Sequence, residues 1–593
     1  MIRPYTTFAV IALSLLSRAP ACGADDAEDA RLNGAFDVYL KESFRREPMS
    51  ATRLGDHAYD DRLDDVSPEA RRANLEFLRE TLERLGRDVH PDQLSPAGKV
   101  DHDVFRRNLE ASIWLRETFD PFRDDPRVYG DYVAESVYLP LTQSTLPREV
   151  NKRNVLKRMQ EVPRILETAR RTIGRPPRVK VETAVRQAEG AVSFYKAELF
   201  QLVGDKPGEG ELTEPAAKIV EALTKYIAFL KDEVLPRRGE EWRIGREKFV
   251  KKLDYELDAG LSADEVLAEA EREATRVESE MGVFARHLWS EYFPGVAVPP
   301  DDEAGRREMI RRVLGRIGDD HGTAETLVAD AKGTVRAIQE FIRAKNILGL
   351  PDPDQLRIIE MPEFMRGNSV AYLNPAPPLD ARGSSEYAIS PPPSEWSRER
   401  AESFLHEYNR AMLQILTIHE AYPGHYVQLE YSNRCPSKIR RVLSSGTFAE
   451  GWAVYTEQMM LDQGFGGGSV PLRLQQLKFY LRAVVNAILD NKMHCGGMTD
   501  AEARELLVGR AFQTDGEAEG KIIRSKQSSC QLSTYFVGRT AFSRLRRAVQ
   551  REQGDRFDLG RYHEAVLSEG TIPVKHLPQL VRARLAETGQ GAR

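Results

Sequence analysis

The chain has 593 residues, of which 30% are charged, and its formal net charge at pH 7 is −6. This balance leaves no broad basic surface, so the composition argues against a nucleic-acid-binding protein. A chain of this length can bury a large core. Most of it has the three- to four-residue hydrophobic spacing of amphipathic helices, which predicts a mainly α protein.

The amino terminus has the pattern of a secretory signal. Arg3 is followed by an apolar run over residues 8–16 and by an Ala-x-Ala cleavage pattern at residues 19–21. The run is too short to cross a membrane. We predict a signal peptide over residues 1–21 and a secreted or periplasmic protein. Cys22 follows directly and is a candidate lipid anchor, which would make the mature protein a membrane-anchored lipoprotein.

The rest of the chain is predicted to form two regions. Residues 28–240 form a helical amino-terminal region and residues 241–593 a catalytic region. Residues 212–235 and 266–284 are clear amphipathic helices with charged outer faces. The stretches 174–178 and 204–210, marked by Gly and Pro, are predicted to be loops rather than domain linkers.

The helical pattern is interrupted between residues 356 and 393. Short β-like runs at 356–359 and 370–373 alternate with proline-rich stretches. We predict a small sheet placed just before the helix that carries the motif described next. An extended peptide could add to the exposed edge of this sheet as a further strand.

The most informative motif is His419-Glu420-Ala421-Tyr422-Pro423-Gly424-His425. The two histidines are six residues apart, so on a regular helix they would point about 120° away from each other. Pro423 disrupts a helix and Gly424 tolerates unusual backbone angles. We therefore predict a break across residues 421–424 that swings His425 back toward His419.

A carboxylate further along the chain is the expected third metal ligand. Glu450 begins a predicted second helix between the small residues Ala449 and Gly451, which we expect to let a metal approach. Glu457, on the same helix, is the rival. His419, His425 and Glu450 would hold Zn²⁺ with one position open for water. Glu420 would then be the general base.

Both motifs resemble those of the domain-of-unknown-function family 885, bacterial proteins allied to the gluzincin metallopeptidases. The second motif is Glu450-Gly451-Trp452-Ala453-Val454-Tyr455-Thr456-Glu457. The resemblance extends along nearly the whole mature chain, so the two regions would form one continuous family domain. It implies a large helical fold like that of zinc metallopeptidases, with a small β-sheet beside the active-site helix.

The same resemblance nominates two further catalytic residues. His494 matches the family's Asp-x-x-x-His segment and Tyr535 its Tyr-x-x-Gly segment, and both are expected to hold the oxyanion of the tetrahedral intermediate. The chain departs from the family at Asn486, where an arginine is usual. Any role of that arginine in binding a substrate carboxylate is therefore in doubt. Arg539 is a candidate substitute.

The cysteines do not form a disulfide framework. Cys435, Cys495 and Cys530 remain after signal removal, with Cys22 as a fourth if cleavage leaves it, and three is an odd set for a chain of 67.0 kDa. A bridge between Cys495 and Cys530 is one candidate.

Together these patterns predict a zinc-dependent hydrolase, a peptidase that cleaves peptide bonds with metal-activated water and Glu420 as the base. Its partner would be a peptide or small amide substrate. Two alternatives stay open: a zinc hydrolase of non-peptide amides or esters, and a non-catalytic helical protein that binds peptides.

Overall fold

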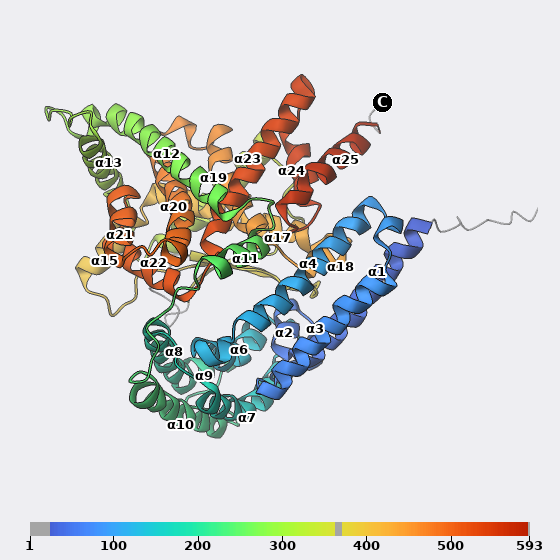
Figure 1. Cartoon of the computed structure of the whole chain (residues 1–593). Helices are drawn as coiled ribbons and strands as arrows, with labels where there is room; N and C mark the ends of the chain where they lie inside the picture. Colours follow the sequence, from blue (N-terminus) through green and yellow to red (C-terminus); the bar gives the residue numbers. More distant parts are fainter. Residues whose placement is uncertain (1–23, 362–370, 591–593) are drawn as a thin grey trace, which may run out of the picture.

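The computed structural model describes residues 24–361 and 371–590 (Figure 1). It is almost entirely helical apart from one small sheet, so the prediction of a mainly α protein is confirmed. The predicted signal peptide and Cys22 lie outside the described residues.

The first part of the chain forms long helices that run along one side of the molecule (Figure 1). Their buried residues, such as Phe36, Phe77 and Phe105, belong to the same core as residues near the end of the chain, such as Leu567 and Val581. These helices are α1 (Ala24–Arg46), α2 (Pro48–Leu54), α3 (Pro68–Asp88) and α4 (Pro96–Thr118).

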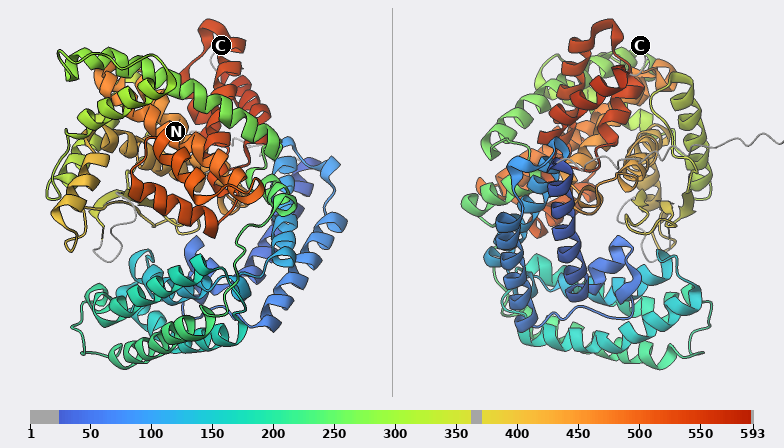
Figure 2. Two further views of the ribbon diagram at one scale, coloured as in Figure 1. Left: turned by 60° about the vertical axis from the view of Figure 1, so that its left-hand side comes forward. Right: turned by 90° about the vertical axis from the view of Figure 1, so that its right-hand side faces the viewer.

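The next helices form a lobe with a core of its own, which lies below the main body in Figure 2. Tyr129, Val162 and Leu230 are among its fully buried residues. The buried cores therefore do not divide at residue 240, because α1, α3 and α4 share a core with helices near the carboxyl terminus, while the lobe and the helices around residues 249–317 each contribute to another core. The lobe contains α5 (Pro121–Asp124), α6 (Arg127–Thr142), α7 (Arg148–Thr172), α8 (Arg178–Lys196), α9 (Glu198–Val203) and α10 (Thr213–Phe229).

The main body is built around the long helix α20, which packs against α12. The α12 helix begins with a capping box in which Ser262 and Glu265 satisfy each other's backbone amides. The helices of this body are α11 (Arg246–Leu257), α12 (Ala263–Tyr292), α13 (Glu303–Gly318), α14 (Leu327–Lys345), α15 (Arg398–Glu407), α16 (Arg410–Glu420), α17 (His425–Asn433), α18 (Lys438–Val442), α19 (Gly446–Asp462), α20 (Val470–Cys495), α21 (Asp500–Arg504), α22 (Asp515–Gln527), α23 (Thr534–Gln553), α24 (Leu559–Leu567) and α25 (Leu577–Gln590).

The sheet has three strands in the order β1-β3-β2. Strand β3 (Ser385–Ile389) lies in the centre, parallel to β1 (Leu356–Glu360) and antiparallel to β2 (Ala371–Asn374). The two outer strands match the predicted β-like runs. The central strand was not predicted from the sequence, although it is the most deeply buried of the three.

A histidine links the sheet to the amino-terminal helices. Nδ1 of His57 lies 2.7 Å from Oδ2 of Asp60, and its Nε2 lies 3.1 Å from Oδ2 of Asp380, in the loop between β2 and β3. The hydrogen bond to Asp60 is the main reason that the pKa of His57 is raised to about 8, and Asp380 contributes in the same direction against the opposing effect of burial.

This contact predicts a pH dependence of stability. The raised pKa means that protonated His57 stabilises the fold fully below its unfolded pKa, about 6.5, and that this contribution is lost as the pH rises through about 8. Thermal unfolding from about pH 6 to pH 9 should show this loss, and His57→Gln should flatten the profile in that window. An unchanged profile in the variant would contradict the assignment.

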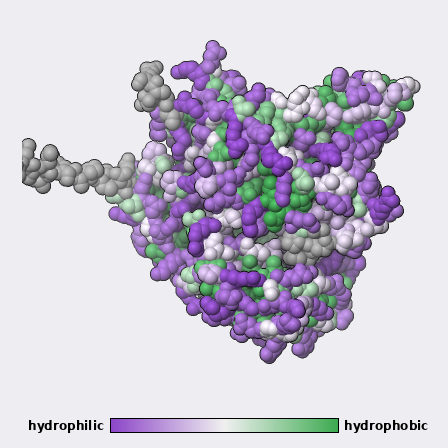
Figure 3. All heavy atoms as spheres, turned by 180° about the vertical axis from the view of Figure 1, so that it is seen from behind, coloured by the Kyte–Doolittle hydropathy of each residue, from purple (hydrophilic) through white to green (hydrophobic). Residues whose placement is uncertain are grey.

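The surface is mostly polar. Figure 3 shows hydrophilic side chains over most of one face, with hydrophobic side chains gathered near its centre. Within the described ranges, no helix is both long and apolar enough to cross a membrane. Cys435, Cys495 and Cys530 are all free thiols, so the candidate bridge between the last two is not formed.

Candidate metal centre

The helix that carries the first histidine stops where the sequence predicts a break. Helix α16 ends at Glu420, and α17 begins at His425. A Cβ atom at position 424 would overlap the carbonyl oxygens of Ile418 and His419, so this close return of the chain requires glycine. The indole of Trp452 on α19 donates a hydrogen bond to the carbonyl of Pro423 at 2.8 Å and so holds the break in place.

The break brings together the three residues predicted as ligands. Oε2 of Glu450 lies 3.8 Å from Nε2 of His419 and 3.5 Å from Nε2 of His425. The two imidazole rings are perpendicular, with centroids 4.8 Å apart. Two nitrogens and one carboxylate oxygen therefore face a common point.

This donor set fits a zinc ion. Zinc takes imidazole nitrogen and carboxylate oxygen at about 2.0–2.1 Å, which at tetrahedral angles places ligand atoms about 3.3 Å apart. The observed separations of 3.5 and 3.8 Å need only a small contraction to reach that value. His419, His425 and Glu450 are thus the residues that could hold the metal.

Glu457, the rival ligand, has a different position. Its Oε1 lies 2.7 Å from Nδ1 of His419, on the side of the ring opposite Glu450. An Nδ1–H that donates to Glu457 leaves the Nε2 lone pair directed at the shared point. Glu457 is completely buried, and this burial raises its pKa well above the usual range. A bound dication would favour the carboxylate form and thereby strengthen the hydrogen bond.

This arrangement predicts a measurable effect of Glu457→Gln. The variant should bind zinc about 10- to 100-fold more weakly, because outer carboxylates orient a histidine ligand and raise its basicity. Competition with a chromophoric chelator would measure the change. Asp462→Asn, which removes a carboxylate from the end of the same helix, is the matched control. Equal affinities for Glu457→Gln and the wild type would refute the role.

Glu420 lies beside the ligands without being one. Its Oε2 accepts a hydrogen bond from the backbone amide of Leu373 in strand β2 at 3.1 Å. The side chain is half-buried, and desolvation is the main reason that its pKa is raised to about 7; the charge of Glu450 acts in the same direction, while His425 opposes the rise. The edge strand therefore positions the predicted base.

The charges at the centre respond to burial and to one another. Burial, reinforced by the nearby His425, lowers the pKa of His419 to about 3, so its imidazole is neutral at pH 7. Burial also disfavours the charged forms of His425 and Glu450. Their mutual interaction outweighs this effect, so the pKa of His425 is raised and that of Glu450 lowered.

Tyr535 reaches this centre because two helices cross at very close range. It lies in the first turn of α23, and hydrogen bonding by its hydroxyl helps to lower the pKa of Glu450. One turn later, Gly538 packs directly against Gly451 of α19, where a Cβ on either residue would overlap the backbone of the other helix. The small residue beside Glu450 thus serves this helix crossing, which corrects our expectation that it lets a metal approach.

His494 does not join the site, so its predicted oxyanion role is wrong. Its Nε2 interacts with the carbonyl oxygens of Ser525 and Ser528 at 2.9 and 3.0 Å, and its ring packs against Phe249 and Trp242. The helix α20 that carries it contacts His419 about one turn before its middle, through Phe479. His494 lies 15 residues further along, which is about 22 Å of helix.

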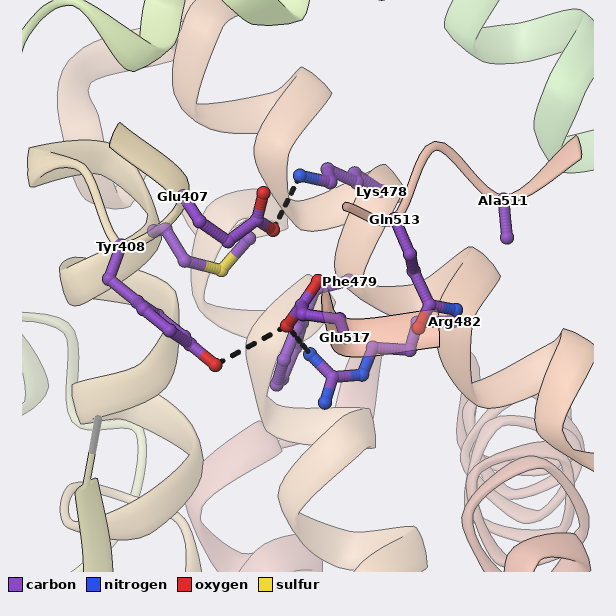
Figure 4. A pocket seen from close by; sticks show the side chains of 9 residues that line it. Glu407, Tyr408, Lys478, Phe479, Arg482, Ala511, Gln513 and Glu517 are labelled. Atoms are coloured by element: carbon purple, nitrogen blue, oxygen red, sulfur yellow. Dashed lines mark hydrogen bonds and ion pairs between the residues drawn. The ribbon is translucent and has the colours of Figure 1, made fainter. Parts of the chain in front are cut away.

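Arg539, the candidate substitute for the missing arginine, donates to Oε1 of Gln458 at 2.5 Å and lies over the ring of Tyr480. Arg482, one turn before Asn486, donates to Glu517 at 3.0 Å and lines the small cavity that Figure 4 shows. Both guanidinium groups therefore already have partners within the protein.

A second cluster of acidic residues and histidine has no such open arrangement. Asp103, Asp258 and His576 lie close together, but Nζ of Lys575 lies 2.9 Å from a carboxylate oxygen of each aspartate. The ammonium group supplies the positive charge that a metal would otherwise bring. We regard this cluster as an ion-pair network that joins α4 to the carboxyl-terminal helices.

Known proteins resemble this chain over nearly its whole length. The family described as "Bacterial protein of unknown function (DUF885)" matches residues 48–581. No curated protein matches the chain. A solved structure of a candidate lipoprotein of unknown function from Shewanella oneidensis is similar over 93% of this chain and 99% of its own, with 31% identity and a TM-score of 0.78. A candidate lipoprotein from Colwellia psychrerythraea matches over 96% of this chain and 100% of its own, with 15% identity and a TM-score of 0.75, a likeness of fold alone.

Proposed function

The chain belongs to the DUF885 family of bacterial proteins, and we propose that it is a zinc-dependent hydrolase of the peptidase class. The observation that carries this proposal is the convergence of His419, His425 and Glu450 on one point, with Glu420 beside them as an additional carboxylate. A structural zinc site uses four protein ligands, whereas three ligands and a nearby base are typical of a catalytic site. A helical fold of the zinc-metallopeptidase type is part of the same proposal.

Each side chain has a separate task in this mechanism. Zinc bound by the three ligands would supply Lewis acidity, which lowers the pKa of water and polarises a carbonyl group. Glu420 accepts the proton of the attacking water and later delivers it to the leaving nitrogen. The amide of Leu373 holds that carboxylate in position. The hydroxyl of Tyr535, next to Glu450, donates to the oxyanion of the tetrahedral intermediate.

Strand β2 favours a peptide as the substrate. It is an outer strand of the sheet, and the amide of Leu373 within it contacts the proposed base directly. A peptide that lies along this strand would present its backbone to Glu420. The side chain of Gln143, at the end of α6, hydrogen-bonds Asn374 at the end of the strand. The lobe thus lies beside the proposed binding edge.

The setting of this activity is proposed to be outside the cytoplasm. Both similar structures come from proteins described as candidate lipoproteins. Their description agrees with the signal pattern of residues 1–21 and with Cys22 as an anchor. We propose that the mature protein is periplasmic or secreted, and tethered through lipid if Cys22 is modified.

Incubation of the zinc-loaded protein with a mixed peptide library and with aryl esters tests the proposal. Mass spectrometry of the peptide library should show cleavage products that disappear when zinc is removed with a chelator and return when zinc is added. If only the esters are hydrolysed, the protein is instead a zinc hydrolase of non-peptide amides or esters. No zinc-dependent product from either set would refute a hydrolase.

A further inference from the structure

One cation near the metal centre is buried without a partner. Lys521 is 7% exposed, and within residues 24–361 and 371–590 its ammonium group forms no hydrogen bond or ion pair. Its Nζ keeps a small contact with solvent, so an anionic ligand could reach it. No carboxylate among the described residues occupies that position, which leaves it open to a negative group of a ligand.

The neighbouring charges in this part of the molecule are already paired. In the cavity of Figure 4, Lys478 contacts Glu407 at 2.6 Å and Arg482 contacts Glu517 at 3.0 Å. Glu517 also accepts a hydrogen bond from Tyr408. Lys521 differs from these residues because no carboxylate in the described part of the chain lies within ion-pair distance of it.

Helix α22 directs this lysine toward the catalytic residues. Glu517, Lys521 and Arg524 are spaced four and three residues apart and so lie on one side of the helix. Arg524 donates to Oε1 of Gln531 at 2.7 Å, and the side-chain amide of Gln531 donates to the hydroxyl of Tyr535 at 3.4 Å. Lys521 itself interacts electrostatically with Glu450. The ammonium group of Lys521 thus lies between two groups of residues, Arg524 with Tyr535 on one side and Arg482 with Glu517 on the other.

The charges facing Lys521 are mainly unfavourable to it. Burial lowers its pKa well below the usual range, and repulsion from Arg482 and Arg524 adds to this effect, against the attraction of Glu517 and Glu450. Glu517 is already engaged by Arg482. Zinc would engage Glu450 in the same way. A ligand carboxylate is the group that would restore the balance of charge.

We propose that Lys521, assisted by Arg524, binds a carboxylate group of the substrate, an inference that rests on the proposed peptidase function. Every unmodified peptide carries such a group at its carboxyl terminus. A terminal carboxylate held beside the zinc ligands would place a bond near the end of the chain at Glu420, as in an exopeptidase that removes residues from the carboxyl end. An acidic side chain is the other source of the same group.

Paired peptides separate these two sources. One pair has a free or an amidated carboxyl terminus, and the second has Glu or Gln inside an amidated peptide. In one of the two pairs, wild-type protein should cleave the member that carries the carboxylate about 10- to 100-fold faster than its neutral partner. This ratio is the size expected for a charged hydrogen bond. Lys521→Gln should abolish that preference through a higher KM, and Lys526→Gln, which changes a lysine on the same helix that pairs with Asp500, should preserve it.

Three results would decide the matter. A preference lost only in Lys521→Gln supports the proposal, and the pair that shows it identifies the carboxylate. Hydrolysis at equal rates within both pairs overturns the proposal while leaving the peptidase function intact. If no peptide is hydrolysed, calorimetric binding of the same pairs to zinc-loaded protein replaces the rate measurement. Equal binding of acid and neutral members then overturns carboxylate recognition as well.

Discussion

Replacing Glu420 with glutamine is expected to leave zinc bound and to reduce the turnover of a peptide substrate by about 100- to 10,000-fold. The glutamine amide keeps the shape of the side chain and can still contact the amide region of Leu373, but it cannot take up a proton. The metal ligands His419, His425 and Glu450 remain in place. Zinc content by mass spectrometry and kcat on the same preparation measure both halves of the prediction.

Glu430→Gln provides the matched control for this variant. Glu430 is a buried carboxylate on α17, the helix that begins with His425, and its nearest ion partner is Arg434 at 3.8 Å. The same chemical change at this position should leave turnover close to the wild-type value. A Glu420→Gln protein with wild-type kcat would show that another group accepts the proton.

Replacing Gly538 with alanine is expected to destabilise the protein by about 3 kcal/mol or more. The added Cβ would overlap the carbonyl oxygen of Thr447 and the backbone of Gly451, and backbone atoms cannot move aside as a flexible side chain can. Helices α19 and α23 would have to separate. Since they carry Glu450 and Tyr535, zinc affinity should fall together with the melting temperature.

Gly190→Ala is the control for helix propensity. Gly190 lies on the exposed side of α8, where an added Cβ would meet no atom within 4 Å. Alanine there should stabilise the protein by about 0.5–1 kcal/mol, because it restricts the unfolded chain and favours the helix. Thermal and chemical unfolding of both variants give the comparison. A Gly538→Ala protein as stable as the wild type would contradict the close crossing.

The local part of the metal centre could be predicted from the sequence. Two histidines six residues apart cannot share a metal on a regular helix, and Pro423 with Gly424 between them indicates where the helix must break. The chain breaks there, between α16 and α17. Before the break the chain forms two helices, α15 and α16, because Asn409 caps the second by accepting a hydrogen bond from the amide of Met412.

The long-range part could not be predicted in the same way. Helix α20 is regular through to His494, so nothing in its pattern reveals which end of it faces the metal centre. The role of Glu457 depends on which side of the His419 ring it approaches, and that side is set by the packing of α19. The sequence likewise cannot show that Lys521 lacks a partner, because this depends on the positions of the charged side chains around it in the folded protein.

Measurement of zinc in the purified mature protein, beside the His419→Ala variant, tests the central claim most directly. We expect about one zinc per chain in the wild type and a loss of stoichiometric metal in the variant, with both proteins folded by circular dichroism. A wild-type protein that binds no stoichiometric zinc after reconstitution would contradict it. The break between α16 and α17 would then be only a turn between two helices.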